Sequence, residues 1–156
     1  MDRIVRQSAR GLIFDSARRL VLIKRTKPGR EPYWVAVGGG LEPGDTSVES
    51  ALHREVAEEI GGGIARVHPV LLITDHLSDG IGLQHVFAAR LMSMSLESRT
   101  GPEFAEPGRG IYEVVRVPAT REAVSELRLL PSQLADFVRA NVNGLLALLD
   151  REDPDS

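Results

Sequence analysis

The sequence predicts a single α/β domain whose first two-thirds are rich in β-strands and whose last third is helical. Three observations lead to this prediction. Apolar runs separated by turn residues fill the first two-thirds, one amphipathic helix interrupts them, and a second closes the chain. The chain has 156 residues, within the usual size of one domain. We expect the domain to cover residues 1–150 and a charged, frayed tail to follow at 151–156.

The strands are predicted from short apolar runs and from the turns between them. The segment Asp15 to Arg19 separates the first two runs and predicts a hairpin. Ser78-Asp79-Gly80 is a second turn signal between two later runs. In chain order, the predicted strands are residues 3–14, 20–25, 34–37, 68–74, 83–91 and 111–117.

The first helix is predicted to begin at Thr46. Thr46 fits the N-cap and Glu49 the returning position of a capping box. Apolar residues then recur every four positions and form a stripe at Val48, Leu52, Val56 and Ile60. The run Gly61–Gly63 ends the helix, because glycine is favoured just past a helix C-terminus. Upstream, glycines at 38–40 and 44 predict a loop whose backbone passes close to a ligand or metal.

The end of the chain predicts a loop and a second helix. The segment Ser93 to Arg109 is long and polar and contains glycine and proline, so we expect a mobile loop over the site. Ser132 is expected to cap a helix that runs through Leu148. Its apolar positions near helical spacing are Leu134, Phe137, Val138, Val142, Leu145 and Leu149.

Three glutamates on the first helix indicate a metal site. Glu55, Glu58 and Glu59 stand at i, i+3 and i+4, so they share one helix face. Like charges at this spacing destabilise a helix by roughly 0.2–0.5 kcal/mol per pair. Such a cluster is understandable if it binds a hard divalent cation, and Mg²⁺ is bound by carboxylates, water and phosphate oxygens. The competing interpretation is a solvated acidic face.

Residues Gly39 to Gly61 resemble the signature of the Nudix hydrolase family, G-x5-E-x7-R-E-U-x-E-E-x-G-U, in which U is a bulky apolar residue. The match is complete from Arg54 through Gly61. At the first acidic position this chain has Asp45, which stands eight residues before Arg54 and is followed by Thr46. The last U position is Gly62.

The resemblance implies an α/β (α+β) fold, an α/β/α sandwich with a mixed β-sheet between the motif helix and the C-terminal helix. It also implies a site for Mg²⁺ or Mn²⁺ on Glu55, Glu58 and Glu59, with a backbone carbonyl of Gly39 or Gly40 as a further ligand. Arg54 is expected to orient a carboxylate, and the competing interpretation is a surface ion pair.

Other candidate residues lie outside the motif helix. The general base is left open between the motif glutamates, Glu58 and Glu59, and the loop residue Glu103, with Glu106 behind it. Arg25 and Lys24 at the end of a strand are candidate phosphate contacts. Tyr112 and His85 are candidate contacts to a nucleobase or another leaving group, although strand residues of these types more often belong to a core or an edge.

These features predict a metal-dependent hydrolase that cleaves the pyrophosphate linkage of a nucleoside diphosphate derivative. Two alternatives are a non-enzymatic Nudix-fold sensor of nucleotide ligands and a diphosphate isomerase. The isomerase chemistry requires a cysteine, and this chain has none.

The composition of the chain limits the kinds of binding partner and cellular location that we expect. A net charge of −3 argues against a general nucleic-acid binder, which is usually basic. The absence of cysteine excludes disulfides and thiolate catalysis. The N-terminus has no apolar signal core and no run reaches membrane-spanning length, so we expect a cytoplasmic protein without a membrane partner. A homodimer is left open.

Overall fold

The computed structural model describes residues 3–100 and 110–151. Its strands are β1 (Ile4–Phe14), β2 (Arg19–Thr26), β3 (Tyr33–Gly40), β4 (Gly62–Leu77), β5 (Gly80–Met94), β6 (Ile111–Pro118) and β7 (Leu129–Leu130). Its helices are α1 (Val48–Ile60), α2 (Arg121–Ser125) and α3 (Ser132–Asp150), with a short 3₁₀ turn, η1 (Leu96–Ser98). All the predicted strands and both predicted helices are confirmed, and α2, β7 and η1 are additional.

The described strands form one mixed sheet in the order β4-β5-β1-β2-β3-β7, with β6 paired to β2. The pairs β1–β5 and β3–β7 are parallel, and the other pairs are antiparallel. Strand β1 changes partner along its length. Its residues Ser8 to Gly11 pair with the end of β3, whereas Ile13 and Phe14 pair with β2. This change of partner brings the glycine-rich end of β3 beside the middle of β1.

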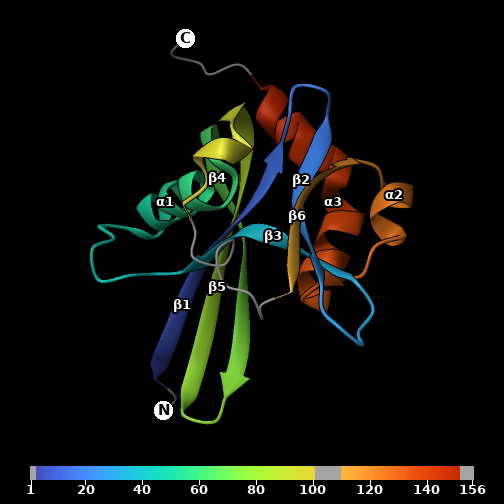
Figure 1. Ribbon diagram of the computed structural model, residues 1–156. Helices are drawn as coiled ribbons and strands as arrows, with labels where there is room; N and C mark the ends of the chain where they lie inside the picture. The colour runs from blue at the N-terminus through green and yellow to red at the C-terminus, as the bar shows by residue number, and fades with distance from the viewer. Residues whose placement is uncertain (1–2, 101–109, 152–156) are drawn as a thin grey trace.

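Alternating side chains give the sheet two apolar faces. Ala9 and Ile13 of β1 pack with Leu52, Val56 and Ile60 of α1. The side chains that point to the other face of β1, β2 and β3 pack against α3. They are Leu12, Phe14, Leu20, Leu22 and Ala36. Helices α1 and α3 therefore cover opposite faces of the sheet, as Figure 1 shows, and the predicted α/β/α sandwich is confirmed.

Both ends of α1 are defined by local contacts. The N-cap is Ser47, and the predicted N-cap at Thr46 is wrong by one residue. The backbone N–H of Ser50 donates to Ser47 Oγ at 3.0 Å, and the backbone N–H of Ser47 donates to Ser50 Oγ at 3.0 Å. Glu49 therefore has no part in the capping box. At the other end, Gly61 has a φ of 58°, and a Cβ there would lie 1.9 Å from the carbonyl oxygen of Ser95. Only glycine fits this position.

Three further expectations are corrected. Gly38–Gly40 belong to strand β3, because they pair with β1, and they do not form a loop. Ser132 is the first residue of α3, whose N-cap is Pro131 without a side-chain capping bond. The predicted loop from Ser93 overlaps β5 and η1. Its residues 101–109 lie outside the described part of the chain, as does the tail from 152.

The β1–β2 turn is organised by one buried carboxylate. Asp15 Oδ1 accepts hydrogen bonds from the backbone N–H groups of Ala17 and Arg19, at 3.0 and 2.9 Å. Asp15 Oδ2 accepts from Arg19 Nε and from Arg116 Nη1 of β6, both at 2.9 Å. Burial alone would raise the pKa of Asp15, but these hydrogen bonds outweigh burial and lower the pKa below its ordinary value.

Candidate active site

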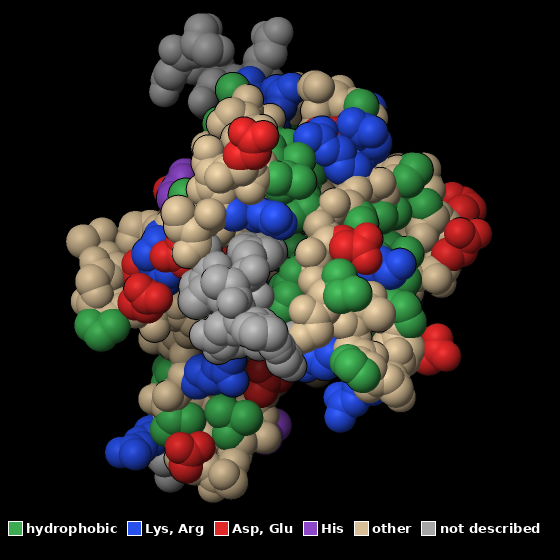
Figure 2. Space-filling model, in the orientation of Figure 1, with side chains coloured by type: hydrophobic (Ala, Val, Ile, Leu, Met, Phe, Trp, Pro, Cys, Tyr) green, Lys and Arg blue, Asp and Glu red, His purple; other side chains and the backbone are tan. Residues whose placement is uncertain are grey.

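A cleft of about 310 Å³ lies between α1 and the part of β2, β3 and β6 that α1 leaves uncovered. A volume of this size is within the range of small-molecule sites. On the face shown in Figure 2, acidic side chains surround a basic one over α1. The cleft is lined by Arg10, Ile23, Arg25, Val35, Gly38, Gly39, Glu42, Glu55, Glu58, Glu59 and Tyr112.

The three glutamates predicted from the helix pattern all line this cleft, but they differ in exposure. Glu55 and Glu59 are buried, at 9% and 8% exposure, whereas 30% of the Glu58 side chain is exposed. Burial raises the pKa of Glu55, and the charge of Arg54 opposes that shift. Glu59 Oε2 accepts a hydrogen bond from the backbone N–H of Gly38 at 3.3 Å. Two buried carboxylates thus face each other beside one half-exposed carboxylate.

Gly39 makes room for one of these carboxylates. A Cβ at position 39 would lie 2.7 Å from Glu55 Oε1 and 3.0 Å from Glu55 Oε2. Any side chain here would therefore displace the Glu55 carboxylate. The glycine predicted from the motif lies directly against the acidic cluster.

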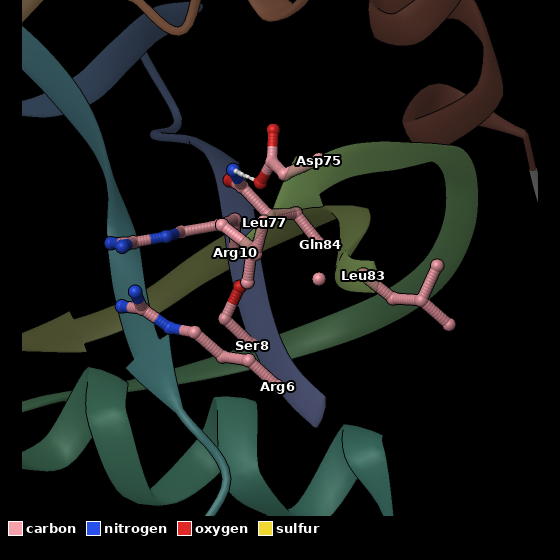
Figure 3. A pocket seen from close by; sticks show the side chains of 8 residues that line it. Arg6, Ser8, Arg10, Asp75, Leu77, Leu83 and Gln84 are labelled. Atoms are coloured by element: carbon pink, nitrogen blue, oxygen red, sulfur yellow. Dashed lines mark hydrogen bonds between the residues drawn. The ribbon is translucent and has the colours of Figure 1, made fainter. Parts of the chain in front are cut away.

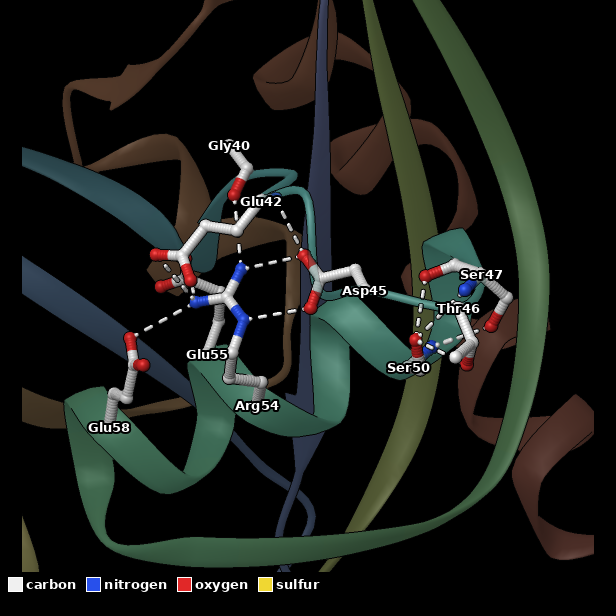
Figure 4. Close-up of polar contacts among 9 residues, drawn as sticks. All are labelled: Gly40, Glu42, Asp45, Thr46, Ser47, Ser50, Arg54, Glu55 and Glu58. Atoms are coloured by element: carbon white, nitrogen blue, oxygen red, sulfur yellow. Dashed lines mark hydrogen bonds and ion pairs between the residues drawn. The ribbon is translucent and has the colours of Figure 1, made fainter.

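Arg54 uses all its N–H groups within the protein (Figure 4). Nε and Nη2 donate to the two oxygens of Asp45 at 2.9 and 3.0 Å, and Nη2 also donates to the carbonyl oxygen of Gly40 at 3.1 Å. Nη1 donates to Glu55 Oε1 at 3.1 Å and to Glu58 Oε2 at 3.2 Å. A guanidinium has five N–H donors, so these contacts engage the whole group. The geometry matches the expected orienting role and leaves no donor for a substrate.

Asp45 has a distinct place in this arrangement. It forms a bidentate ion pair with Arg54, and its Oδ2 also accepts a hydrogen bond from the backbone N–H of Glu42 at 2.7 Å. The hydrogen bond from Arg54 lowers the pKa of Asp45, and Asp45 in turn contributes most to the raised pKa of Arg54. The altered acidic position of the motif therefore anchors Arg54, and Asp45 is absent from the cleft lining.

The predicted substrate contacts divide into two groups. Arg25 and Tyr112 both line the cleft, and the Arg25 guanidinium carbon lies 4.0 Å from the centre of the Tyr112 ring. Lys24 does not line it. Its ammonium lies 5.6 Å from the ring centre of Trp34, which packs in the α3-side core. Neighbouring strand residues point to opposite faces, so Arg25 and Lys24 could not both reach the cleft.

Two other predicted residues lie away from the cleft or outside the description. His85 is on β5, where Nε2 is 2.8 Å from Gln7 Oε1, and it is not among the lining residues. Of the two glycines whose carbonyl was predicted as a metal ligand, Gly40 accepts a hydrogen bond from Arg54 and only Gly39 is among the lining residues of the cleft. Glu103 and Glu106 lie outside the described residues.

Sequence patterns missed two charged residues of the cleft, Arg10 and Glu42. Arg10 Nη1 donates to the carbonyl oxygens of Gly38 at 2.8 Å and Ala36 at 3.4 Å. Burial lowers the pKa of Arg10, while Glu59 and Glu55 oppose that shift. A signal was present in the sequence, because Arg10 is a lone charge within the otherwise uncharged run from Gln7 to Phe14.

The donor chemistry of the cleft fits a hard divalent cation. Carboxylate and carbonyl oxygens are the donors that Mg²⁺ and Mn²⁺ prefer. Among residues 3–100 and 110–151, however, no three acidic or histidine side chains converge closely enough to hold one ion. Arg54 restrains Glu55 and Glu58, and the Gly38 amide restrains Glu59. Binding an ion would therefore require these carboxylates to rearrange from their present contacts.

Several solved structures share this fold. The solution structure of the E. coli ORF135 protein matches with a TM-score of 0.63 and 20% identity, over 94% of this chain and 94% of that chain. The crystal structure of an ADP compounds hydrolase matches with a TM-score of 0.69 and 22% identity, over 92% of this chain and 74% of that chain. A MutT protein from Methanosarcina mazei Go1 matches with a TM-score of 0.60 and 18% identity, over 92% and 96%. At these identities the likeness shows the fold.

The sequence itself carries the assignment to a family. No curated protein matches it significantly. The model of the NUDIX domain, however, matches residues 5–133, which include all of β1 but its first residue, strands β2 to β7, helix α1 and the complete cleft lining. The chain therefore belongs to the Nudix family.

Proposed function

We propose that this protein hydrolyses the pyrophosphate linkage of a nucleoside diphosphate derivative with Mg²⁺ or Mn²⁺ bound at Glu55, Glu58 and Glu59. The observation that carries the proposal is the meeting, in one cleft, of these carboxylates with Arg25 from the facing strand. The carboxylates suit a cation, and the arginine suits the phosphate that the cation would accompany.

Each group in the cleft has a proposed task. The bound metal would neutralise charge on the phosphoryl oxygens and make a water molecule nucleophilic. Arg25 would donate to a phosphate oxygen, and Tyr112, which lies against Arg25, would contact the leaving group. Arg54 would hold Glu55 and Glu58 in position, and the Gly39 carbonyl would be the backbone ligand.

The proton acceptor remains a choice between two glutamates. Glu58 is the most exposed of the three cluster members, so water reaches it most easily. Glu103, on the segment outside the described residues, is the second candidate. Replacement of Glu103 by Gln should remove the acidic limb of the pH–rate profile if Glu103 is the base. An unchanged profile and rate would assign the base to the cluster.

The substrate class rests on two independent supports. One similar structure is that of an ADP compounds hydrolase and others are of MutT proteins, so proteins with this fold include one that acts on nucleotide derivatives. The cleft also offers apolar surface at Ile23 and Val35 beside its charged groups. A base or another flat group would pack there.

The test is a screen of nucleoside diphosphate derivatives with the purified protein in Mg²⁺ or Mn²⁺, measuring released phosphate compounds. Glu59→Gln should lower turnover by about 100-fold or more, as removal of a major electrostatic contribution does. Glu49→Gln is the matched control, because Glu49 is an exposed residue of the same helix and is absent from the cleft. Wild-type turnover in Glu59→Gln would overturn the metal assignment.

The cellular setting is part of the proposal. No helix in the described residues is long and apolar enough to span a membrane. We propose a cytoplasmic location, where nucleotide derivatives are abundant.

A further inference from the structure

A second, smaller cavity of about 90 Å³ adjoins the active-site cleft and shares one residue with it. It lies on β1, β4 and β5 and is lined by Arg6, Ser8, Arg10, Asp75, Leu77, Gly82, Leu83 and Gln84 (Figure 3). Arg10 is the shared residue. The volume is several times the space that a water molecule needs.

The guanidinium of Arg10 has donors to spare at this junction. Among the described residues, its hydrogen bonds come from Nη1 alone, to Ala36 and Gly38. The Nε–H and Nη2–H groups are therefore available to a ligand. Because the two backbone carbonyls hold Nη1, the remaining donors are fixed in direction before any ligand arrives.

Arg6 adds a second cation to the same cavity. The Arg6 and Arg10 side chains extend in the same direction from alternate positions of β1 (Figure 3). Burial is the main cause that lowers the pKa of Arg10, and the charges of Arg6 and Arg25 lower it further, while Glu59 and Glu55 oppose that shift. An anion bound between Arg6 and Arg10 would interact favourably with both cations.

The other polar groups of the cavity suit an oxyanion. The Ser8 hydroxyl is a further donor within a residue that is 4% exposed. Asp75 is the acidic member of the lining, and its Oδ2 accepts from Gln84 Nε2 at 2.9 Å (Figure 3). The carboxylate is thus partly satisfied by Gln84, and the two arginines still outnumber it.

We propose that Arg6, Ser8 and Arg10 bind a second anionic group of the substrate, a phosphate-like oxyanion next to the phosphoryl group over the glutamates. This inference rests on the proposed function. It narrows the substrate to a nucleoside diphosphate derivative with a further phosphate, either as a third phosphate in the chain or as a phosphomonoester on the linked moiety. Arg10 contacts both phosphate positions, and Arg6 contacts the outer one alone.

The test compares the binding of inorganic pyrophosphate and inorganic tripolyphosphate, each with Mg²⁺, by isothermal titration calorimetry. Wild-type protein should bind tripolyphosphate about tenfold more tightly. Arg6→Gln should remove that preference and leave pyrophosphate affinity unchanged. Arg10→Gln should weaken binding of both ligands by about tenfold or more. Arg121→Gln removes an exposed charge on α2, away from both cavities, and should change neither affinity.

Two results would overturn the inference. Equal affinities of wild-type and Arg6→Gln for tripolyphosphate would show that the outer cavity binds no anion. If Arg10→Gln has a lower melting temperature but unchanged affinities for both ligands, Arg10 only stabilises β3 and binds no anion. If Arg10→Gln does not fold, the tripolyphosphate affinity of Arg6→Gln still tests the inference. Hydrolysis of nucleoside diphosphate derivatives by wild-type protein tests the proposed function separately. Substrates with the third phosphate in the chain or on the linked moiety then distinguish the two sources.

Discussion

At the residue scale, the cleft depends on a single arginine, Arg54, whose N–H groups all bond within the protein. Two nitrogen atoms of Arg54 donate to Asp45, and the third donates to Glu55 and Glu58. The guanidinium is planar, so fixing one edge against Asp45 fixes the direction of the other edge. The position of the Glu55 and Glu58 carboxylates is therefore set by Asp45, a residue outside the cleft lining.

Asp45→Asn should weaken this arrangement. An amide keeps one acceptor for Arg54 but removes the charge and one of the two accepted bonds. We expect the Mg²⁺ concentration for half-maximal activity to rise by about 10-fold, as changes to residues behind metal ligands typically do. A Mg²⁺ titration of turnover measures this, with Asp79→Asn in the exposed β4–β5 turn as the control. Identical Mg²⁺ dependence in both variants would contradict the anchoring role.

Gly39→Ala tests the space behind Glu55. The new methyl group would overlap the Glu55 carboxylate, which can move because it is the end of a flexible side chain. We expect the fold to persist and turnover to fall by about 100-fold, since displacement by about 1 Å can have that effect. Gly44→Ala is the control, because a Cβ at Gly44 meets nothing within 4 Å. Equal turnover in the two variants would show that Glu55 needs no such space.

At the element scale, helix α1 combines a stability determinant at its start with the three cleft glutamates in its second half. The cap involves Ser47 and Ser50, and the carboxylates begin at Glu55. The two functions are thus more than one helical turn apart. Changes at the cap should act on stability and leave the cleft intact.

Ser47→Ala should lower the free energy of unfolding by about 0.5–2 kcal/mol, because the Ser50 N–H loses its acceptor. Thr46→Ala should have a smaller effect, since the Thr46 hydroxyl contacts the Ser50 hydroxyl and no helix N–H group. Urea denaturation of both variants measures the difference, and turnover per folded molecule should stay unchanged. A larger loss for Thr46→Ala would place the cap where the sequence pattern first suggested.

How far the sequence predicts the elements depends on whether their contacts are local. Helix α1 was predictable because the stripe ending at Ile60 and the stop at Gly61 are read from neighbours in the chain. The site role of Arg10 was not, because it comes from the pairing of β1 with β3 and from a bond to Gly38, 28 positions away. Alternation alone places Lys24 and Arg25 on opposite faces, but only the packing of α1 shows which face bears the cleft.

At the scale of the whole molecule, ion pairs connect segments that are far apart in sequence. Asp15 joins the β1–β2 turn to Arg116 of β6, and Arg18 joins the same turn to Asp150 at the end of α3. In the Asp15–Arg116 pair the Asp15 side chain is buried, whereas both side chains of the Arg18–Asp150 pair are about half exposed. The Asp15 contacts should therefore dominate the stability of this end of the protein.

Asp15→Asn should lower the free energy of unfolding by about 1–3 kcal/mol at pH 7, because charged hydrogen bonds to Arg19 and Arg116 are lost. The folded-state pKa of Asp15 lies below its ordinary value of about 3.9. Its contribution is therefore present above about pH 4 and is lost as the pH falls through the folded-state pKa. Thermal denaturation should show the wild-type advantage narrowing below pH 4, and an advantage that persists unchanged into acid would contradict this account.

The central position of β1 has a consequence for how the chain folds. This strand is made early, yet its parallel neighbour β5 arrives much later, since Ala9 pairs with His85. Strand β2 likewise pairs with β6, which is synthesised much later, since Leu22 pairs with Val115. Pairings between such distant residues slow folding, because a large loop must close before the contacts form. During synthesis on the ribosome, β1, β2 and β3 can therefore pair early, whereas the β1–β5 and β2–β6 edges must remain open until β5 and β6 have emerged.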